Sequence, residues 1–178
     1  ELGLKRGRYI LVSAHREENI DNGENFLSLM NGLNGIAKQY KLPVIYSTHP
    51  RSWKKLEEKG FKFHKLVRQL KPFGFIDYNN LQLTSFCVLS DSGTLSEESA
   101  ILGFPGVLIR TSTERPEVLD KGTIVIGGIA EKDIAQAVDI GIGTRIEAYG
   151  ADLTGLQELL TYGLKGTAAY ADHAQILG

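Results

Sequence analysis

The chain has 178 residues, of which 42% are hydrophobic and 23% are charged, a composition typical of a globular protein with one sizeable core. Its 20 basic and 21 acidic residues give a net charge of −1 and are mixed along the sequence, which argues against a general nucleic-acid binder, because such a protein needs a clustered basic face. The single cysteine allows no disulfide within the chain, and no apolar run reaches the roughly 18 residues that cross a bilayer, so we expect no membrane partner.

Apolar runs and amphipathic stretches alternate along most of the chain. Short apolar runs predict buried parallel strands, and apolar residues at three- and four-residue spacing predict helices. In chain order we predict a strand at 9–13, a helix at 25–40, a strand at 43–47, a helix at 53–59, a strand at 63–70, a helix at 75–84, a strand at 86–89, a helix at 95–102, a strand at 106–110, a helix at 116–121, a strand at 123–126 and a helix at 131–140. This alternation predicts an α/β protein with a Rossmann-like doubly wound parallel sheet.

The two ends of the chain suggest how it is organised. It begins at Glu1 instead of Met and soon enters a strand, so we expect it to be a fragment of a longer protein. No signal-peptide pattern stands at the start, which favours a cytoplasmic protein. Residues 142–178 are rich in Ala and Gly and carry a stripe of leucines, which predicts a helical tail.

Polar residues follow four of the predicted strands, at the point where each strand ends. They occupy residues 13–16, 47–51, 91–94 and 110–115. Two of the four histidines, His15 and His49, lie in these segments. Because doubly wound sheets bind ligands at the carboxyl ends of their strands, we predict one binding site there, with basic groups for phosphate and carboxylates for sugar or ribose hydroxyls.

The run from Ser90 to Glu98 joins a predicted strand to a predicted helix. Ser92, Gly93 and Thr94 would then stand at the helix N-terminus, where unpaired backbone N–H groups and the helix dipole form an anion site that small side chains leave open. The run is also typical of an ordinary capped helix, since Ser and Thr are good N-caps. The pattern by itself leaves both interpretations open.

Three motifs lie in these polar segments. They are His-Arg-Glu-Glu-Asn at 15–19, Ser-Asp-Ser-Gly-Thr at 90–94 with Glu97 and Glu98, and Thr-Glu-Arg-Pro-Glu at 113–117. In this order and spacing they resemble the signatures of the non-hydrolysing UDP-N-acetylglucosamine 2-epimerases, and the resemblance covers roughly residues 9–128. It looks closer still to the branch that epimerises UDP-2-acetamido-2,6-dideoxy-L-talose, a step toward capsule and O-antigen sugars, on the strings at 13–21 and 46–51.

The resemblance implies two Rossmann-like domains facing each other across a cleft, as in GT-B glycosyltransferases, with residues 1–178 as the C-terminal, nucleotide-binding domain. It also implies a reaction in which UDP is eliminated across C1–C2 of the sugar and re-added with C2 inverted. Because several of the family's acidic catalytic groups belong to the N-terminal domain, we expect this chain to bind UDP and a UDP-N-acetyl-amino sugar without turning the sugar over. The resemblance further implies a homodimeric full-length protein and no cofactor.

The same resemblance assigns roles to individual positions. Those implied to bind UDP are Ser92, Gly93, Thr94, Tyr78, Glu98 and Arg115. The first three would hold the diphosphate, Tyr78 would receive the uracil through its backbone, and Glu98 would accept hydrogen bonds from the ribose. His15 would be the catalytic residue, as a proton donor to the leaving group or as part of proton transfer.

A second set of positions is implied to line another UDP-sugar site or to support the loops: Arg16, Glu18, His49 and Glu117. Arg115 and Glu117 would brace the loop beside the phosphates, and an Arg–Glu pair that only holds this loop shut is an equal alternative. Two positions depart from the family pattern. Thr94 stands where a second Gly is common, and Glu17 replaces an Arg, which puts a negative charge near a phosphate-facing loop.

Other functions remain open from the sequence. Half of a GT-B glycosyltransferase would share the Ser-Gly phosphate site, although the motifs at 15–19 and 113–117 favour the epimerase. A hydrolysing epimerase and a non-catalytic nucleotide-sugar sensing domain are further alternatives. A dinucleotide-binding dehydrogenase is disfavoured because the first strand leads into Ser-Ala-His instead of a Gly-x-Gly-x-x-Gly loop, and no metal site is predicted because the histidines lack ligand spacing.

Overall fold

The computed structural model describes residues 2–110 and 124–149. Its elements in chain order are β1 (Ile10–Ser13), α1 (Glu17–Ile20), α2 (Gly23–Tyr40), β2 (Val44–Ser47), α3 (Pro50–Glu58), β3 (Val67–Leu70), α4 (Phe75–Thr84), β4 (Cys87–Ser90), α5 (Leu95–Leu102), β5 (Gly106–Ile109), β6 (Ile124–Gly127) and α6 (Glu131–Tyr149). None of the helices in the described ranges is long and apolar enough to cross a membrane.

The six strands form one parallel sheet in the order β3-β2-β1-β4-β5-β6. The chain builds the sheet outward from β1 on one side and then, from β4 onward, outward on the other side. This is the strand order of a Rossmann fold, so the predicted doubly wound α/β sheet is confirmed.

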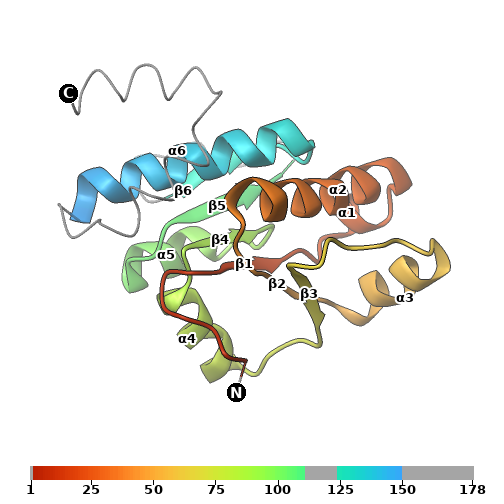
Figure 1. Ribbon diagram of the computed structural model, residues 1–178, viewed down its shortest axis with the longest axis horizontal. Helices are drawn as coiled ribbons and strands as arrows, with labels where there is room; N and C mark the ends of the chain where they lie inside the picture. The colour runs from red at the N-terminus through yellow and green to blue at the C-terminus, as the bar shows by residue number, and fades with distance from the viewer. Residues whose placement is uncertain (1, 111–123, 150–178) are drawn as a thin grey trace.

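Side chains that alternate along each strand divide the core into two layers. Ile10 and Val12 of β1 pack in the layer formed with α2 and α6, whereas Leu11 between them packs in the layer formed with α4 and α5. Figure 1 shows these two helix pairs on opposite faces of the sheet. Both faces are therefore covered, which explains why β1, β2, β4 and β5 are apolar at nearly every position.

Several elements differ from the sequence predictions. The third strand begins at Val67 instead of residue 63, and helix α3 begins at Pro50 instead of residue 53. A short helix, α1, follows β1 and was not predicted, because four residues are too few to show a helical period. The last helix, predicted to end at residue 140, continues as α6 to Tyr149 through two glycines. A helix-interior glycine costs only about 1 kcal/mol relative to alanine, and burial of Ile134 and Val138 in the core offsets that cost. The helix predicted at 116–121 lies outside the described residues.

Helices α2 and α6 approach each other closely on the same face of the sheet (Figure 1). A Cβ on Gly32 of α2 would stand 2.5 Å from Ile134 Cδ1, and one on Gly35 would stand 2.5 Å from Glu131 Oε1. The two glycines therefore provide the space into which α6 packs.

A buried polar pair lies further along the same interface. The Tyr40 hydroxyl donates a hydrogen bond to the Asp139 carboxylate. Burial raises the pKa of Asp139 to about 6, although the hydrogen bond from Tyr40 favours its charged form. Burial and the neighbouring carboxylate together raise the pKa of Tyr40 above its ordinary value, so its hydroxyl stays protonated.

Candidate functional site

The segments that follow β1 and β4 meet at the carboxyl edge of the sheet. Ser13 and Ser90 are paired in the register of these two strands, so residues 14–19 leave the sheet beside residues 91–94. The strand order reverses at this point, and doubly wound proteins bind ligands in the crevice of such a switch point. Two of the predicted polar segments are thus brought together.

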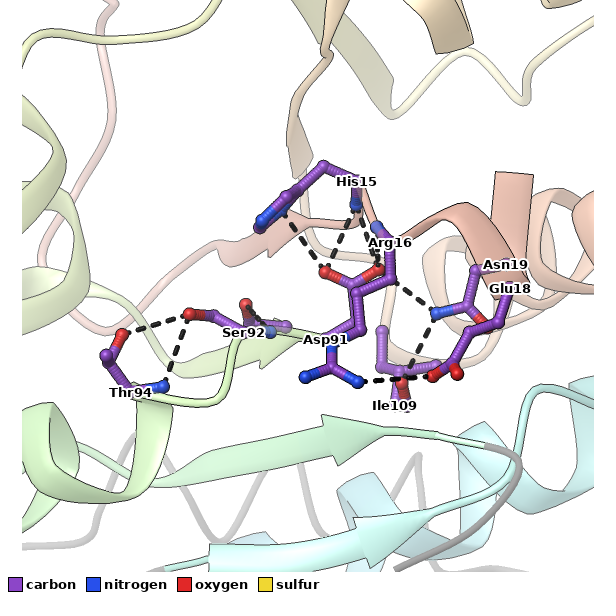
Figure 2. Close-up of polar contacts among 9 residues, drawn as sticks. His15, Arg16, Glu18, Asn19, Asp91, Ser92, Thr94 and Ile109 are labelled. Carbon is purple, nitrogen blue, oxygen red and sulfur yellow. Dashed lines mark hydrogen bonds and ion pairs between the residues drawn. The ribbon is translucent and has the colours of Figure 1, made fainter. Parts of the chain in front are cut away.

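Asp91 anchors the loop that follows β1 (Figure 2). Its fully buried carboxylate accepts the backbone N–H of His15 at 2.9 and 3.1 Å and that of Arg16 at 2.8 Å. The side-chain amide of Asn19 donates to the same carboxylate at 3.1 Å. All of these donors belong to residues 15–19, so a single carboxylate fixes the loop and α1 to the end of β4.

His15, the predicted catalytic residue, lies at this edge with its side chain half exposed. The ring nitrogen Nδ1 is 3.3 Å from Asp91 Oδ1, and Figure 2 shows the imidazole lying over the Asp91 carboxylate. Nε2 is on the opposite side of the ring. The imidazole can therefore present Nε2 to a ligand as a proton donor or acceptor.

Ser92, Gly93 and Thr94 form the turn that leads into α5, as predicted, and Thr94 is the N-cap residue. The Thr94 side chain does not cap the helix in the usual way. It shares a 2.9 Å hydrogen bond with the Ser92 hydroxyl and donates to Glu98 Oε1 at 2.7 Å. The Thr94 side chain therefore does not act as an ordinary N-cap of α5.

The Glu98 carboxylate is held from two sides. Thr94 donates to Oε1, and the buried Gln82 of α4 donates from Nε2 to Oε2 at 2.7 Å. Because Thr94 gives its one hydroxyl proton to Glu98, the Ser92 hydroxyl is the donor in the bond between the two hydroxyls. Thr94, the departure from the family's glycine, thus links Ser92 to Glu98 and orients the carboxylate.

Two guanidinium groups lie beside Gly93. A Cβ on Gly93 would stand 3.5 Å from Arg110 Nη2 and 4.0 Å from Arg16 Nη2. Arg110 is buried directly after β5, and Arg16 forms an ion pair with Glu18 at 3.6 Å. Two cations next to the start of a helix make this the region of the described chain best suited to a phosphate.

Tyr78 of α4 belongs to the same edge. Burial raises the pKa of Tyr78 to about 12, and side-chain hydrogen bonds with Ser13 and Ser90 act in the opposite direction. Those serines are the last residues of β1 and β4, so the phenol lies beneath the point where the two loops leave the sheet.

His49 and Glu17 are used differently from the other predicted positions. The His49 imidazole caps α3 by accepting the backbone N–H of Arg51 at Nδ1, 3.3 Å away. The Arg51 guanidinium reaches Glu17 at 3.3 Å and Asp21 at 3.0 Å. The negative charge of Glu17 is therefore partnered by Arg51, and the contacts of His49 are those of loop support.

The remaining predicted positions, Arg115 and Glu117, lie outside the described residues. Within the described ranges, no group of three or more His, Cys, Asp or Glu side chains is placed to hold a metal ion.

Four residues that build the site received no individual role from the sequence: Asn19, Gln82, Asp91 and Arg110. Asp91 and Arg110 stand in two of the predicted strand-end segments, and Asn19 closes the motif at 15–19. Gln82 lies inside a helix and carries no such signal.

Comparisons with known proteins give one consistent family. The model of the family described as UDP-N-acetylglucosamine 2-epimerase matches residues 1–153. A UDP-N-acetylglucosamine 2-epimerase of Methanococcus maripaludis is 35% identical over 139 residues, which are 76% of this chain and 38% of that protein. A UDP-2,3-diacetamido-2,3-dideoxy-D-glucuronate 2-epimerase of Pseudomonas aeruginosa is 32% identical over 142 residues, which are 80% of this chain and 39% of that protein.

Solved structures agree with the sequence matches. UDP-GlcNAc 2-epimerase of Methanocaldococcus jannaschii, in complex with UDP-GlcNAc and UDP, superposes with a TM-score of 0.67 at 29% identity over 80% of this chain and 45% of that one. UDP-GlcNAc 2-epimerase of Neisseria meningitidis, bound to UDP-GlcNAc, gives 0.63 at 30% identity over 80% of this chain and 37% of that one. The chain therefore spans less than half the length of these relatives.

Proposed function

Since the chain belongs to the UDP-N-acetylglucosamine 2-epimerase family, we propose that it binds the UDP of a UDP-N-acetyl-hexosamine at the carboxyl ends of β1 and β4, and that the whole protein inverts C2 of the sugar. The observation that carries the proposal is the meeting of the 15–19 loop, the 92–94 turn and Glu98 at the switch point of the sheet. The ligands named for the two solved relatives support the choice of nucleotide.

The diphosphate would lie over the turn at residues 92–94. Gly93 has no side chain to block the approach of a phosphate, and the turn stands at the positive end of the α5 helix dipole. Arg16 and Arg110 add charge beside Gly93, and Arg–phosphate hydrogen bonds are about twice as strong as neutral ones. The negative charge of UDP would thus be opposed by two cations and a helix dipole.

The nucleoside would extend from this turn toward α4. Glu98 would accept hydrogen bonds from the ribose hydroxyls, because an ionised carboxylate has about four acceptor positions and only two donors hold it. The backbone near Tyr78 would receive the uracil. The phenol itself is occupied with Ser13 and Ser90, which fits a contact through the backbone better than one through the side chain.

Epimerisation requires a C2–H bond and the C1–O bond to the diphosphate to break, with a C1=C2 double bond formed between them. UDP leaves, and re-addition restores both bonds with the proton on the other face of C2. In this proposal His15, whose side chain is half exposed, would transfer a proton at Nε2 next to the leaving diphosphate. We assign the binding of UDP to this chain and turnover to the whole protein. In the whole protein a second Rossmann-like domain would close the cleft, as in GT-B enzymes.

The proposal extends to the identity of the sugar, the use of the product and the oligomeric state. We propose that the sugar is UDP-2-acetamido-2,6-dideoxy-L-talose, on the strings at 13–21 and 46–51, and that the product serves capsule or O-antigen synthesis in the cytoplasm. The full-length protein would be a homodimer, and Arg16, Glu18 and His49 would line a second UDP-sugar site or support its loops.

Calorimetric titration of UDP into the 178-residue chain tests the proposal, with UMP and NAD as comparison ligands. We expect UDP to bind in preference to both. Glu98→Ala should weaken UDP binding by about 1.5–3 kcal/mol, which is roughly tenfold or more, because a hydrogen bond to a charged group is lost.

Glu97→Ala is the matched control, since Glu97 is an exposed carboxylate on the same turn of α5 and has no assigned role. It should leave UDP affinity unchanged. Equal binding of UDP, UMP and NAD by the folded chain, or equal losses in the two variants, would contradict the proposed site.

A further inference from the structure

The proposed function gives no role to the contact between Asp91 and the imidazole of His15 at the switch point. Asp91 is fully buried and places its carboxylate 3.3 Å from Nδ1 of His15 (Figure 2). The same carboxylate accepts the backbone N–H groups of His15 and Arg16 and the amide of Asn19. The imidazole and its own backbone are therefore held by one rigid group.

The number of donors identifies the charge state of this carboxylate. A buried carboxylate is costly unless hydrogen bonds compensate for the lost water, and here three N–H donors from residues 15–19 do so. A protonated acid would have to direct its own O–H among these donors. Asp91 is thus arranged as an acceptor-only, ionised group.

An acceptor-only group selects the tautomer of the neighbouring imidazole. If Nδ1 carried no proton, its partial negative charge would lie 3.3 Å from the negative charge of Asp91 Oδ1, which is repulsive. A proton on Nδ1 turns the same contact into an attraction and leaves Nε2, on the exposed side of the ring, without a proton. The half-exposed side chain of His15 allows a ligand to reach that nitrogen.

We infer that Asp91 is a positioning residue, which holds His15 in the Nδ1-protonated tautomer and directs Nε2 to the sugar–diphosphate bond. The inference rests on the proposed function for the identity of the ligand, but the tautomer is a property of the chain alone. Nε2 is then the nitrogen that accepts a proton from the reacting sugar and returns it. Asp91 acts only through His15 and touches no reacting atom.

Nitrogen-15 NMR of the 178-residue chain, labelled at histidine, tests the inference directly. The His15 signals are assigned by their loss in His15→Gln, which separates them from those of the other three histidines. We expect neutral His15 to carry its proton on Nδ1, the opposite of the Nε2-protonated form that a free imidazole side chain favours in water. A proton on Nε2 in the native chain would overturn the inference.

Asp91→Asn sharpens the test, because the asparagine amide can turn an N–H toward Nδ1 while its oxygen keeps accepting from the backbone. We expect the proton to move to Nε2 in this variant, because Nδ1 then faces a donor and the imidazole returns to the tautomer that it favours in water. Asp77→Asn on the exposed side of α4 is the control and should leave the His15 tautomer unchanged. If Asp91→Asn does not fold, the measurement on the native chain still decides.

Titration of UDP into the same samples separates this inference from the proposed function. Native His15 protonated on Nε2 together with UDP binding would remove the role of Asp91 and leave the nucleotide site intact. His15 protonated on Nδ1 without any UDP binding would confirm the Asp91 contact and reject the nucleotide assignment. We expect both the Nδ1 proton and UDP binding.

Discussion

Two buried aspartates, Asp91 at the carboxyl edge of the sheet and Asp139 between α2 and α6, show how differently one side chain behaves at equal burial. Asp91 is 0% exposed and Asp139 is 3% exposed. Asp91 accepts three close N–H donors on its two oxygens. Asp139 Oδ1 accepts the Tyr40 hydroxyl and, at 3.5 Å, the Gln39 side-chain amide, and its Oδ2 has no hydrogen-bond partner among the described residues.

The comparison shows that the number of hydrogen-bond donors, more than the degree of burial, decides how well a site stabilises an ionised carboxylate. At Asp139 burial outweighs the hydrogen bond and raises the pKa to about 6. At Asp91 the segment at 15–19 supplies the N–H groups that a carboxylate needs. The edge of the sheet is therefore built around a fixed negative charge, and the helix interface contains an acid that gains a proton easily.

Removing the Asp91 carboxylate should lower the free energy of unfolding more than any other change proposed for this chain. Asp91→Ala leaves three buried or half-buried N–H donors without their acceptor, so the free energy of unfolding should fall by about 3–5 kcal/mol. Urea unfolding monitored by circular dichroism measures this change. Ser92→Ala, the partly exposed neighbour, should cost less than about 1 kcal/mol, and a similar small loss in Asp91→Ala would break the comparison.

Asp139→Asn should change the pH dependence of stability. The folded protein binds the Asp139 proton more tightly than the unfolded chain does, because the folded pKa of about 6 lies above the ordinary value of 3.8. This contribution to stability is complete below about pH 4 and is lost as the pH rises through 6.

As the pH rises from 4 to 8, the free energy of unfolding of Asp139→Asn should therefore increase by up to about 3 kcal/mol relative to that of the native chain. A tenfold difference in proton affinity corresponds to about 1.4 kcal/mol. Urea unfolding of both proteins across this range measures the gain. Parallel stability profiles would show that Asp139 is no easier to protonate than an ordinary aspartate.

Gln82→Met extends the comparison to Glu98, a carboxylate that is only partly buried. Losing the 2.7 Å bond from Nε2 should weaken UDP binding by about 0.5–1.5 kcal/mol, or roughly two- to tenfold. Stability should stay constant or rise, because Gln82 is buried and its Oε1 lacks a hydrogen-bond partner in the described part of the chain. Calorimetry and urea unfolding on one preparation separate these effects, and unchanged affinity would show that Glu98 needs no support from α4.

Glu17→Gln should give the smallest effect. Glu17 and Arg51 form an exposed ion pair at 3.3 Å, with 79% and 52% of their side chains accessible. Such pairs contribute about 0–1 kcal/mol and are screened by salt. Unfolding at low and high salt should show a loss of less than about 0.5 kcal/mol that disappears at high salt; a larger, salt-independent loss would place Glu17 in the loop network of Asp91.

Much of the fold could be predicted because parallel strands buried on both faces leave nearly unbroken apolar runs in the sequence. The strands β1, β2, β4 and β5 were recognised in this way. Helix α1 could not be recognised, since its four residues owe their position to the Asp91 carboxylate, which is far away in the sequence. The length of α6 was missed because Gly141 and Gly143 weaken the helical pattern just beyond residue 140.

The candidate site was predictable where a residue stands next to a strand end, and less so elsewhere. His15 and the turn at 92–94 lie where the predicted topology requires. The support of Glu98 by Gln82 joins two helices, and the partnership of Glu17 with Arg51 joins α1 to α3, so neither follows from local spacing. These contacts depend on packing that the sequence pattern does not specify.

The reversal of strand order between β1 and β4 also has a consequence for how the protein folds. His15 and Asp91 are 76 residues apart in the chain, and the elements from α1 to α4 are all contained in the loop that their contact closes. Closing a loop of that length costs about 4 kcal/mol of chain entropy, which the β1–β4 pairing and the packing around it must offset. A ligand that binds only the assembled edge will therefore slow amide hydrogen exchange in both halves of the sheet together.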